Sequence, residues 1–347
     1  MAVSPIANTE CVSPSFPVDV YSTCVQSLDH DSASYLERVI DVSRWSEEAG
    51  CKGMLIYTDN SIVDPWFVAQ MTLLHTKSLL PLVAVQPIYM HPYWLAKKVT
   101  SLAYLHRRQV ALNMLAGGFK NDLIALNDST PHDRRYARMV EYTHIFTRLL
   151  QGKTVSFHGE FYTVEALSLK PALPPELYPL ILSSGSSDAG LAAAREIQAT
   201  AVQYPAPPGE FKAPDGDGQY GLRVGIVARN DAETAWEIAL ARFPEDRRGA
   251  LTHELAMKVS DSQWHQQLSA RPKAEGRTTY WLGPFQHSKS NCPYLVGDYS
   301  QVAGELAKYM KAGFQTIILD IPPTREELEH IGGVFRLATR MAGNEAQ

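Results

Sequence analysis

Short apolar segments alternate with longer amphipathic segments along most of the chain. Eight apolar segments predict β-strands, at residues 18–25, 53–57, 80–86, 109–115, 180–184, 199–204, 221–228 and 314–321. Helical spacing of apolar residues predicts helices at 34–49, 65–75, 94–106, 133–150, 188–196, 232–243, 299–312 and 325–341. Near-continuous apolar strands that alternate with helices indicate a parallel sheet covered on both faces. Eight such units predict a closed (β/α)8 TIM barrel, an α/β fold, with an open doubly wound sheet as the alternative.

Two insertions interrupt this pattern, within what we expect to be a single barrel domain over residues 18–347 that follows an N-terminal extension at 1–17. The first, at about 151–177, has aromatic residues around Gly159, which predicts a small hairpin. The second, at about 245–291, has the length of a lid or of an interface. Gly276 and Gly283 are available as hinges, so we expect a lid that brings His287 or Lys289 toward the site.

Composition narrows the class of protein. The 347 residues are 45% hydrophobic and carry a formal net charge of -5, which shows no basic excess for nucleic acid or an anionic membrane. The four cysteines have no CxxC or metal-type spacing, so we expect no metal site and no disulfide framework. No leader or membrane-spanning segment is evident, and we expect a cytoplasmic protein.

A serine-rich turn follows the fifth predicted strand. Gly185, Ser186 and Ser187 stand between the apolar run at 180–182 and a predicted helix. Free N–H groups and hydroxyls at the N-terminus of a helix suit a phosphate group. The alternative is an ordinary turn in which Ser187 or Asp188 caps the helix.

The ends of the predicted strands supply amide, hydroxyl and small residues but few titratable bases. In a barrel, chemistry is located at the C-terminal ends of the strands. Such a set suits an organic cofactor that brings its own reactivity.

In order and at similar spacing, eight motifs resemble the bacterial-luciferase-like flavin monooxygenases, and most closely the two-component alkanesulfonate monooxygenases. The motifs are GMLIYT at 53–58, DPW at 64–66, LNMLAG at 112–117, RY at 135–136, LLQGKTVSFHG at 149–159, GSSD at 185–188, GLR at 221–223 and LVGD at 295–298. The resemblance covers roughly residues 18–340.

The resemblance implies a barrel that binds reduced FMN, delivered by a separate NAD(P)H-dependent flavin reductase. Gly185, Ser186 and Ser187 match the segment that holds the FMN phosphate, and Tyr136 matches a tyrosine that also reaches the phosphate. Residues 113–117, with Asn113 and Gly117 at their ends, match the strand end beside the isoalloxazine ring. The alternatives are a Tyr136 hydroxyl in solvent and an Asn113 amide that satisfies loop backbone.

On the substrate side, Arg223 matches the arginine that the sulfonate enzymes direct toward the flavin and an anionic substrate. Tyr204 stands where that family has a tryptophan. The mobile-loop arginine aligns loosely with residues 287–289, so His287 and Lys289 are candidates, although Lys289 also fits an ordinary solvated lysine.

Three residues of the sulfonate pattern are absent. The family's cysteine, histidine and late tyrosine fall near residue 62 or 63, at Gly225 and near Pro322. We therefore do not expect a sulfonate substrate.

The expected function is a flavin monooxygenase that uses reduced FMN and O2, through a C4a-peroxyflavin, on a small organic substrate, anionic ones included. The resemblance also implies a homodimer or homotetramer. Two alternatives stay open: a deazaflavin-dependent hydride transferase on the same barrel, and a flavin-binding protein without turnover.

Overall fold

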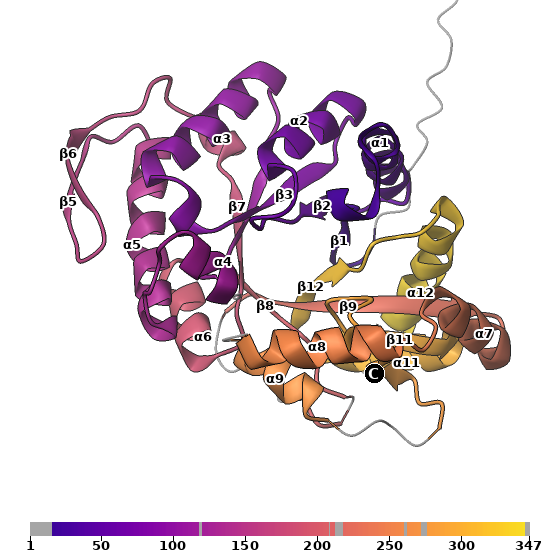
Figure 1. The fold of residues 1–347 in the computed structure, drawn as a ribbon. Helices are drawn as coiled ribbons and strands as arrows, with labels where there is room; N and C mark the ends of the chain where they lie inside the picture. The colour runs from indigo at the N-terminus through magenta and orange to yellow at the C-terminus, as the bar shows by residue number, and fades with distance from the viewer. Residues whose placement is uncertain are drawn as a thin grey trace, which may run out of the picture.

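The computed structural model describes residues 16–117, 120–207, 209–211, 218–259, 262–271 and 276–343. Within these residues, eight parallel strands close into a barrel (Figure 1). They are, in order of pairing, β1 (Asp19–Thr23), β2 (Gly53–Ile56), β3 (Leu80–Val85), β4 (Ala111–Met114), β7 (Leu180–Ser184), β8 (Thr200–Gln203), β9 (Tyr220–Arg229) and β12 (Phe314–Leu319). Because β12 pairs with β1 and β9 pairs with β8, the sheet has no free edge within the barrel. The predicted closed barrel is confirmed.

The predicted helices cover the outside of this barrel (Figure 1). They are α1 (Ser32–Glu48), α2 (Pro65–His75), α3 (Pro92–His106), α5 (His132–Leu150), α6 (Asp188–Glu196), α7 (Ala232–Arg242), α11 (Tyr299–Lys311) and α12 (Arg325–Gly343). Side-chain caps fix several of their starts. Asp64 accepts a hydrogen bond from the backbone N–H of Trp66, and Asp298 forms a capping box with Gln301.

An apolar layer fills the inside of the barrel. Seven strands each contribute one buried side chain to it: Tyr21, Leu55, Leu82, Ala111, Leu182, Val202 and Ile318. In a barrel, side chains alternate between the interior and the helix layer, so each strand can be apolar on both faces. This layer supports whatever lies at the C-terminal end of the barrel.

The first insertion contains the predicted hairpin. Strands β5 (Val155–His158) and β6 (Thr163–Leu167) pair antiparallel, which confirms that prediction. Beside α5, the hairpin projects away from the barrel (Figure 1).

The sequence pattern did not predict four short elements of the described residues. They are the helix α4 (Lys120–Ala125) and three 3-10 turns, η1 (Ser27–Asp29), η2 (Pro87–Tyr89) and η3 (Pro175–Leu177).

The second insertion is more structured than its sequence indicated. It contains α8 (Arg247–Val259), α9 (Gln263–Ser269), β10 (Tyr280–Trp281) and α10 (Gly283–Gln286), and β11 (Tyr294–Asp298) follows it. Strand β9 is long enough to pair with three other strands. Its first half pairs with β8 and β12 in the barrel, and its second half, from Gly225 to Arg229, pairs with β11 outside it. The prediction missed β11 because its apolar run is short.

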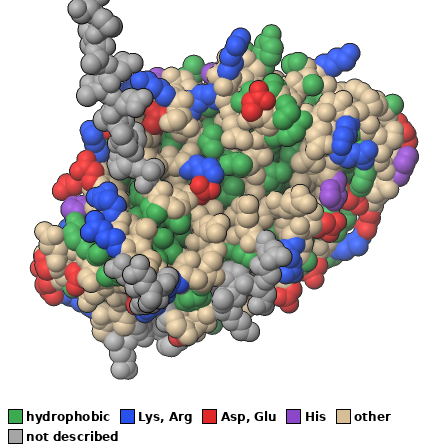
Figure 2. Space-filling view, turned by 180° about the vertical axis from the view of Figure 1, so that it is seen from behind, with side chains coloured by type: hydrophobic (Ala, Val, Ile, Leu, Met, Phe, Trp, Pro, Cys, Tyr) green, Lys and Arg blue, Asp and Glu red, His purple; other side chains and the backbone are tan. Residues whose placement is uncertain are grey.

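The described chain begins at Phe16, whose ring packs edge-on against Phe335 with 5.0 Å between the ring centroids. Residues 1–15 of the predicted extension lie outside the described residues. Among the helices of the described ranges, none combines the length and the apolar character needed to cross a membrane. Basic and acidic side chains both occur on the face seen in Figure 2.

Candidate active site

A cavity of about 340 Å³ opens at the C-terminal end of the barrel. Its wall includes residues from the ends of six barrel strands and three from the second insertion, Ser262, His265 and Asn291. Leu55 and Val202 belong both to this wall and to the interior apolar layer, so the barrel core forms the floor of the cavity. Six predicted cofactor residues line it, namely Asn113, Gly117, Tyr136, Gly185, Ser186 and Ser187, together with Tyr204 and Arg223.

The serine turn, which we define as Gly185, Ser186 and Ser187, joins β7 to α6. The Ser187 hydroxyl caps α6 by accepting a hydrogen bond from the backbone N–H of Gly190 at 3.2 Å. Ser187 is therefore a helix cap and a cavity residue at the same time. Because the cap occupies only the N–H of Gly190, the turn still presents a helix N-terminus to the cavity.

Tyr136 of α5 packs directly onto this turn. A Cβ atom on Gly185 would lie 2.6 Å from the Tyr136 hydroxyl oxygen, so only glycine fits there without displacing the ring. Burial raises the pKa of Tyr136, while a hydrogen bond with Ser187 acts in the opposite direction. The Tyr136 hydroxyl thus lies against the serine turn and not in solvent.

Asn113 and Gly117 lie at the end of β4. The buried Asn113 side chain accepts a hydrogen bond through Oδ1 from the Ser184 hydroxyl at 2.9 Å. Gly117 has φ +100°, a left-handed conformation that favours glycine, and a Cβ there would lie 3.3 Å from Gln86 Oε1. Both residues therefore shape the cavity wall through the backbone and through neighbouring polar groups.

Arg223 reaches the cavity from β9. Its Nη2 atom donates a hydrogen bond to the Tyr57 hydroxyl, and its guanidinium carbon lies 4.9 Å from the Tyr57 ring centroid. The Nε atom is buried, and no group among the described residues accepts a hydrogen bond from it. A buried donor without a partner is costly, so this N–H is available to a ligand.

Tyr204 and His265 form the wall beside Arg223. Their rings lie 5.2 Å apart, centroid to centroid, at an angle of 47°. Burial first, and the positive charge of Arg223 second, lower the pKa of His265 to about 4. The imidazole is therefore uncharged at neutral pH, and Arg223 is the main positive charge of this wall.

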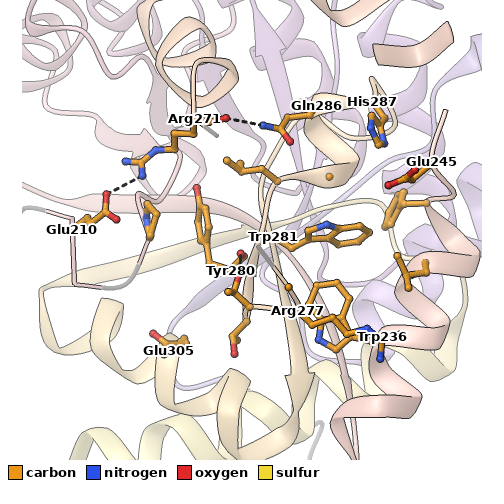
Figure 3. Close-up of a pocket in the computed structure, with 18 residues that line it drawn as sticks. Glu210, Trp236, Glu245, Arg271, Arg277, Tyr280, Trp281, Gln286, His287 and Glu305 are labelled. Atoms are coloured by element: carbon orange, nitrogen blue, oxygen red, sulfur yellow. Dashed lines mark hydrogen bonds and ion pairs between the residues drawn. The ribbon is translucent and has the colours of Figure 1, made fainter. Parts of the chain in front are cut away.

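The structure does not bring His287 and Lys289 to this cavity. His287, after α10, lines a separate cavity of about 620 Å³ with Trp236 and Trp281 (Figure 3). Lys289 forms an ion pair with Asp246 at 2.9 Å. Neither residue lines the cavity at the barrel end, so the expected lid role for them would require the segment to move.

Tyr57, His132 and His265 are among the cavity residues that were missed as site candidates from the sequence. Tyr57 lies within the GMLIYT motif, which was a usable signal. His132 packs against Tyr136, one helical turn away on α5. His265 gave no signal, because its helix lies in an insertion without strand–helix spacing.

Comparison with known proteins places the chain in a family. The sequence pattern of the luciferase-like monooxygenases matches residues 17–316. The chain belongs to that family. One member, from Niallia circulans, is 33% identical over 311 residues, which are 86% of this chain and 91% of the relative. It is 4-(gamma-L-glutamylamino)butanoyl-[BtrI acyl-carrier protein] monooxygenase BtrO.

Solved structures share the fold at lower sequence identity. The long-chain alkane monooxygenase LadA superposes with a TM-score of 0.70 at 15% identity, covering 93% of this chain and 92% of LadA. An F420-dependent secondary alcohol dehydrogenase superposes with a TM-score of 0.60 at 14% identity, covering 92% of this chain and 99% of the dehydrogenase. The barrel is therefore shared by oxygenases and by deazaflavin enzymes.

Proposed function

We propose that this protein is a two-component flavin monooxygenase that uses reduced FMN and O2 to oxygenate a small organic substrate. The observation that carries the proposal is one cavity with a serine-capped helix N-terminus at one side and a buried arginine with a free N–H at the other. Membership of the luciferase-like monooxygenase family supports the reaction class.

The described residues fit FMN. The serine turn and the Tyr136 hydroxyl would hold the phosphate, because a helix N-terminus and hydroxyl groups suit an anion. The tight approach of Tyr136 to Gly185 keeps this recess free of any side chain at residue 185. Leu55, Ala84 and Val202 offer an apolar floor for a flat ring system. Reduced FMN would supply two electrons, so that one oxygen atom of O2 enters the substrate and the other leaves as water.

Arg223 would orient an anionic or carbonyl oxygen of the substrate, because a guanidinium in a cavity with few acids favours negative charge. Tyr204 would form the apolar wall beside it. The insertion that carries His265 would exclude water from the barrel end.

The substrate class is open to direct test. The BtrO relative acts on an acyl chain carried by an acyl-carrier protein. We propose acyl thioesters and free carboxylates as the first candidate substrates. Alkanesulfonates serve as the negative comparison, because the cysteine, histidine and tyrosine of the sulfonate pattern are absent from this chain.

The deciding experiment combines the protein with FMN, a flavin reductase, NADPH and 18O2. A monooxygenase releases hydrogen peroxide without substrate, and releases less when a substrate takes up one 18O atom. Mass spectrometry of the products and a peroxide assay measure the two quantities. The proposal would be contradicted if no product contained 18O and if no candidate substrate changed the release of peroxide. The result would then favour a flavin-binding protein without turnover.

The F420-dependent neighbour favours one second candidate, a deazaflavin-dependent hydride transferase. Such an enzyme needs no oxygen. Anaerobic turnover with a reduced deazaflavin, at affinity higher than that for reduced FMN, would establish it in place of the monooxygenase.

A further inference from the structure

His265 enters the cavity from an element that is not part of the barrel. It lies on α9, and its ring packs between Tyr204, at 5.2 Å, and Phe285 of α10, at 5.4 Å between centroids. The ring therefore has a fixed position, set by aromatic contacts on two sides. Its Nε2 atom is buried, and no group in the described ranges forms a hydrogen bond with it.

Two residues that line the cavity, Arg223 and His265, thus each carry a buried nitrogen atom, Nε and Nε2 respectively, that lacks a partner within the described chain. They come from elements 42 residues apart in the sequence, and their side chains are close enough for the charge of Arg223 to act on the imidazole. Buried polar atoms are seldom left unsatisfied, and a ligand bound in the cavity would account for both of these.

The groups that face His265 determine its charge. They are Arg223 from β9, the neutral hydroxyl of Tyr204 after β8, and His253 of α8, whose own pKa burial lowers. None of these supplies a negative charge that would favour the imidazolium form. His265 therefore offers a hydrogen bond without adding a second positive charge next to Arg223.

We infer that His265 is a specificity-determining residue of the cofactor cavity, whose Nε2 atom forms a hydrogen bond with bound FMN next to Arg223. The inference rests on the proposed function, because it takes FMN as the ligand. It assigns to the second insertion a direct role in cofactor binding, in addition to excluding water.

Three variants test this role through binding alone. His265→Leu removes the nitrogen but keeps an apolar side chain against Tyr204, and His265→Gln keeps a hydrogen-bonding group at similar reach. His253→Leu is the matched control, because His253 bonds to Ser269 of α9 and does not line the cavity. The dissociation constant of reduced FMN, titrated without oxygen, is the measured quantity, and thermal unfolding checks that each variant is folded.

We expect His265→Leu to bind reduced FMN about five- to tenfold more weakly, as for loss of one hydrogen bond. His265→Gln and His253→Leu should both stay within about twofold of the unmodified protein. Equal affinity of His265→Leu and the unmodified protein would overturn the inference. So would equal weakening in His265→Gln or in His253→Leu, since the nitrogen itself would then not matter.

A spectroscopic measurement gives a second, independent readout. In protein labelled with 15N-histidine, the Nε2 signal that disappears in His265→Leu should shift when oxidised FMN is added. An unchanged signal at saturating FMN would contradict the contact. Binding of FMN by the unmodified protein reports on the proposed function, whereas the differences among variants report on His265, so the two failures are distinguishable.

Discussion

The two ends of the cavity are built in different ways. The serine end consists of Gly185, Ser186 and Ser187 with Tyr136 packed on them, so one continuous turn and one helix supply it. The arginine end consists of Tyr57, Tyr204, Arg223 and His265, which come from four separate segments. The serine end depends on local backbone geometry, whereas the arginine end depends on the closure of the barrel and on the position of an insertion.

This difference predicts different responses to mutation. Changes at the serine end should act on cofactor binding, because hydrogen-bond donors and space for the phosphate are lost together. Changes at Arg223 and its partner Tyr57 should act mainly on the reaction, because an oriented charge matters most where charge develops. His265 differs from these two residues, because we infer that it contacts FMN itself. The predictions below test this division.

The largest effect is expected from Ser186→Ala combined with Ser187→Ala. Loss of both hydroxyls should weaken reduced FMN binding by roughly 1–3 kcal/mol, measured by anaerobic flavin titration. Because Ser187 also caps α6, a matched control is Asp231→Ala, which removes the cap of α7 away from the cavity. Unchanged FMN affinity in the double variant would show that this turn does not bind the FMN phosphate.

A smaller loss of binding is expected from Gly185→Ala. The added Cβ would lie 2.6 Å from the Tyr136 hydroxyl oxygen, so the ring must shift from its position against the serine turn. We expect FMN affinity to fall by about tenfold, or about 1.4 kcal/mol. Gly304→Ala in α11 is the control, since a Cβ there meets nothing within 4 Å. If Gly185→Ala binds FMN as tightly as this control, the packing argument is wrong.

At the arginine end, Arg223→Ala should fold normally and lose at least about tenfold in turnover, because an oriented charge in a dry site commonly contributes more than about 1.4 kcal/mol to the transition state. Steady-state kinetics on the substrate found by 18O incorporation provides the measurement. Arg223→Lys, which keeps the charge but not the planar fork, should recover part of the loss. Full activity of Arg223→Ala would show that Arg223 has a structural role and no role in the reaction.

The smallest effect is expected from Tyr57→Phe. The ring stays beneath the guanidinium of Arg223, but the hydroxyl that accepts its hydrogen bond is removed. We expect turnover to fall about threefold while FMN affinity stays the same, since the ring still holds the guanidinium of Arg223 in place after the hydroxyl is lost. Tyr89→Phe removes a hydroxyl bonded to Asn60 outside the cavity and serves as control. A larger loss in FMN affinity than in turnover would contradict the division between the two ends.

The sequence by itself determined eight parallel strands covered by helices, whereas the pairings of β12 with β1 and of β9 with β8 decided that they close into a barrel. Apolar runs such as those of β3 and β9 are buried on both faces, and only a parallel sheet covered by helices accommodates eight of them. The serine turn was equally visible, because a contiguous strand, glycine and helix cap specify their own geometry. Tyr136 was placed through the resemblance, since nothing in its local pattern indicates that it packs on Gly185 from a distant helix.

Only the tertiary structure decided the arginine end. Arg223 could be named from its motif, but its contact with Tyr57 exists because β2 and β9 lie on the same closed barrel. The second insertion shows the limit most clearly: its helices place His265 in the cavity while His287 and Lys289 face elsewhere. Local periodicity determines whether a helix forms, but the direction of its side chains follows from packing between segments far apart in the sequence, which no local pattern encodes.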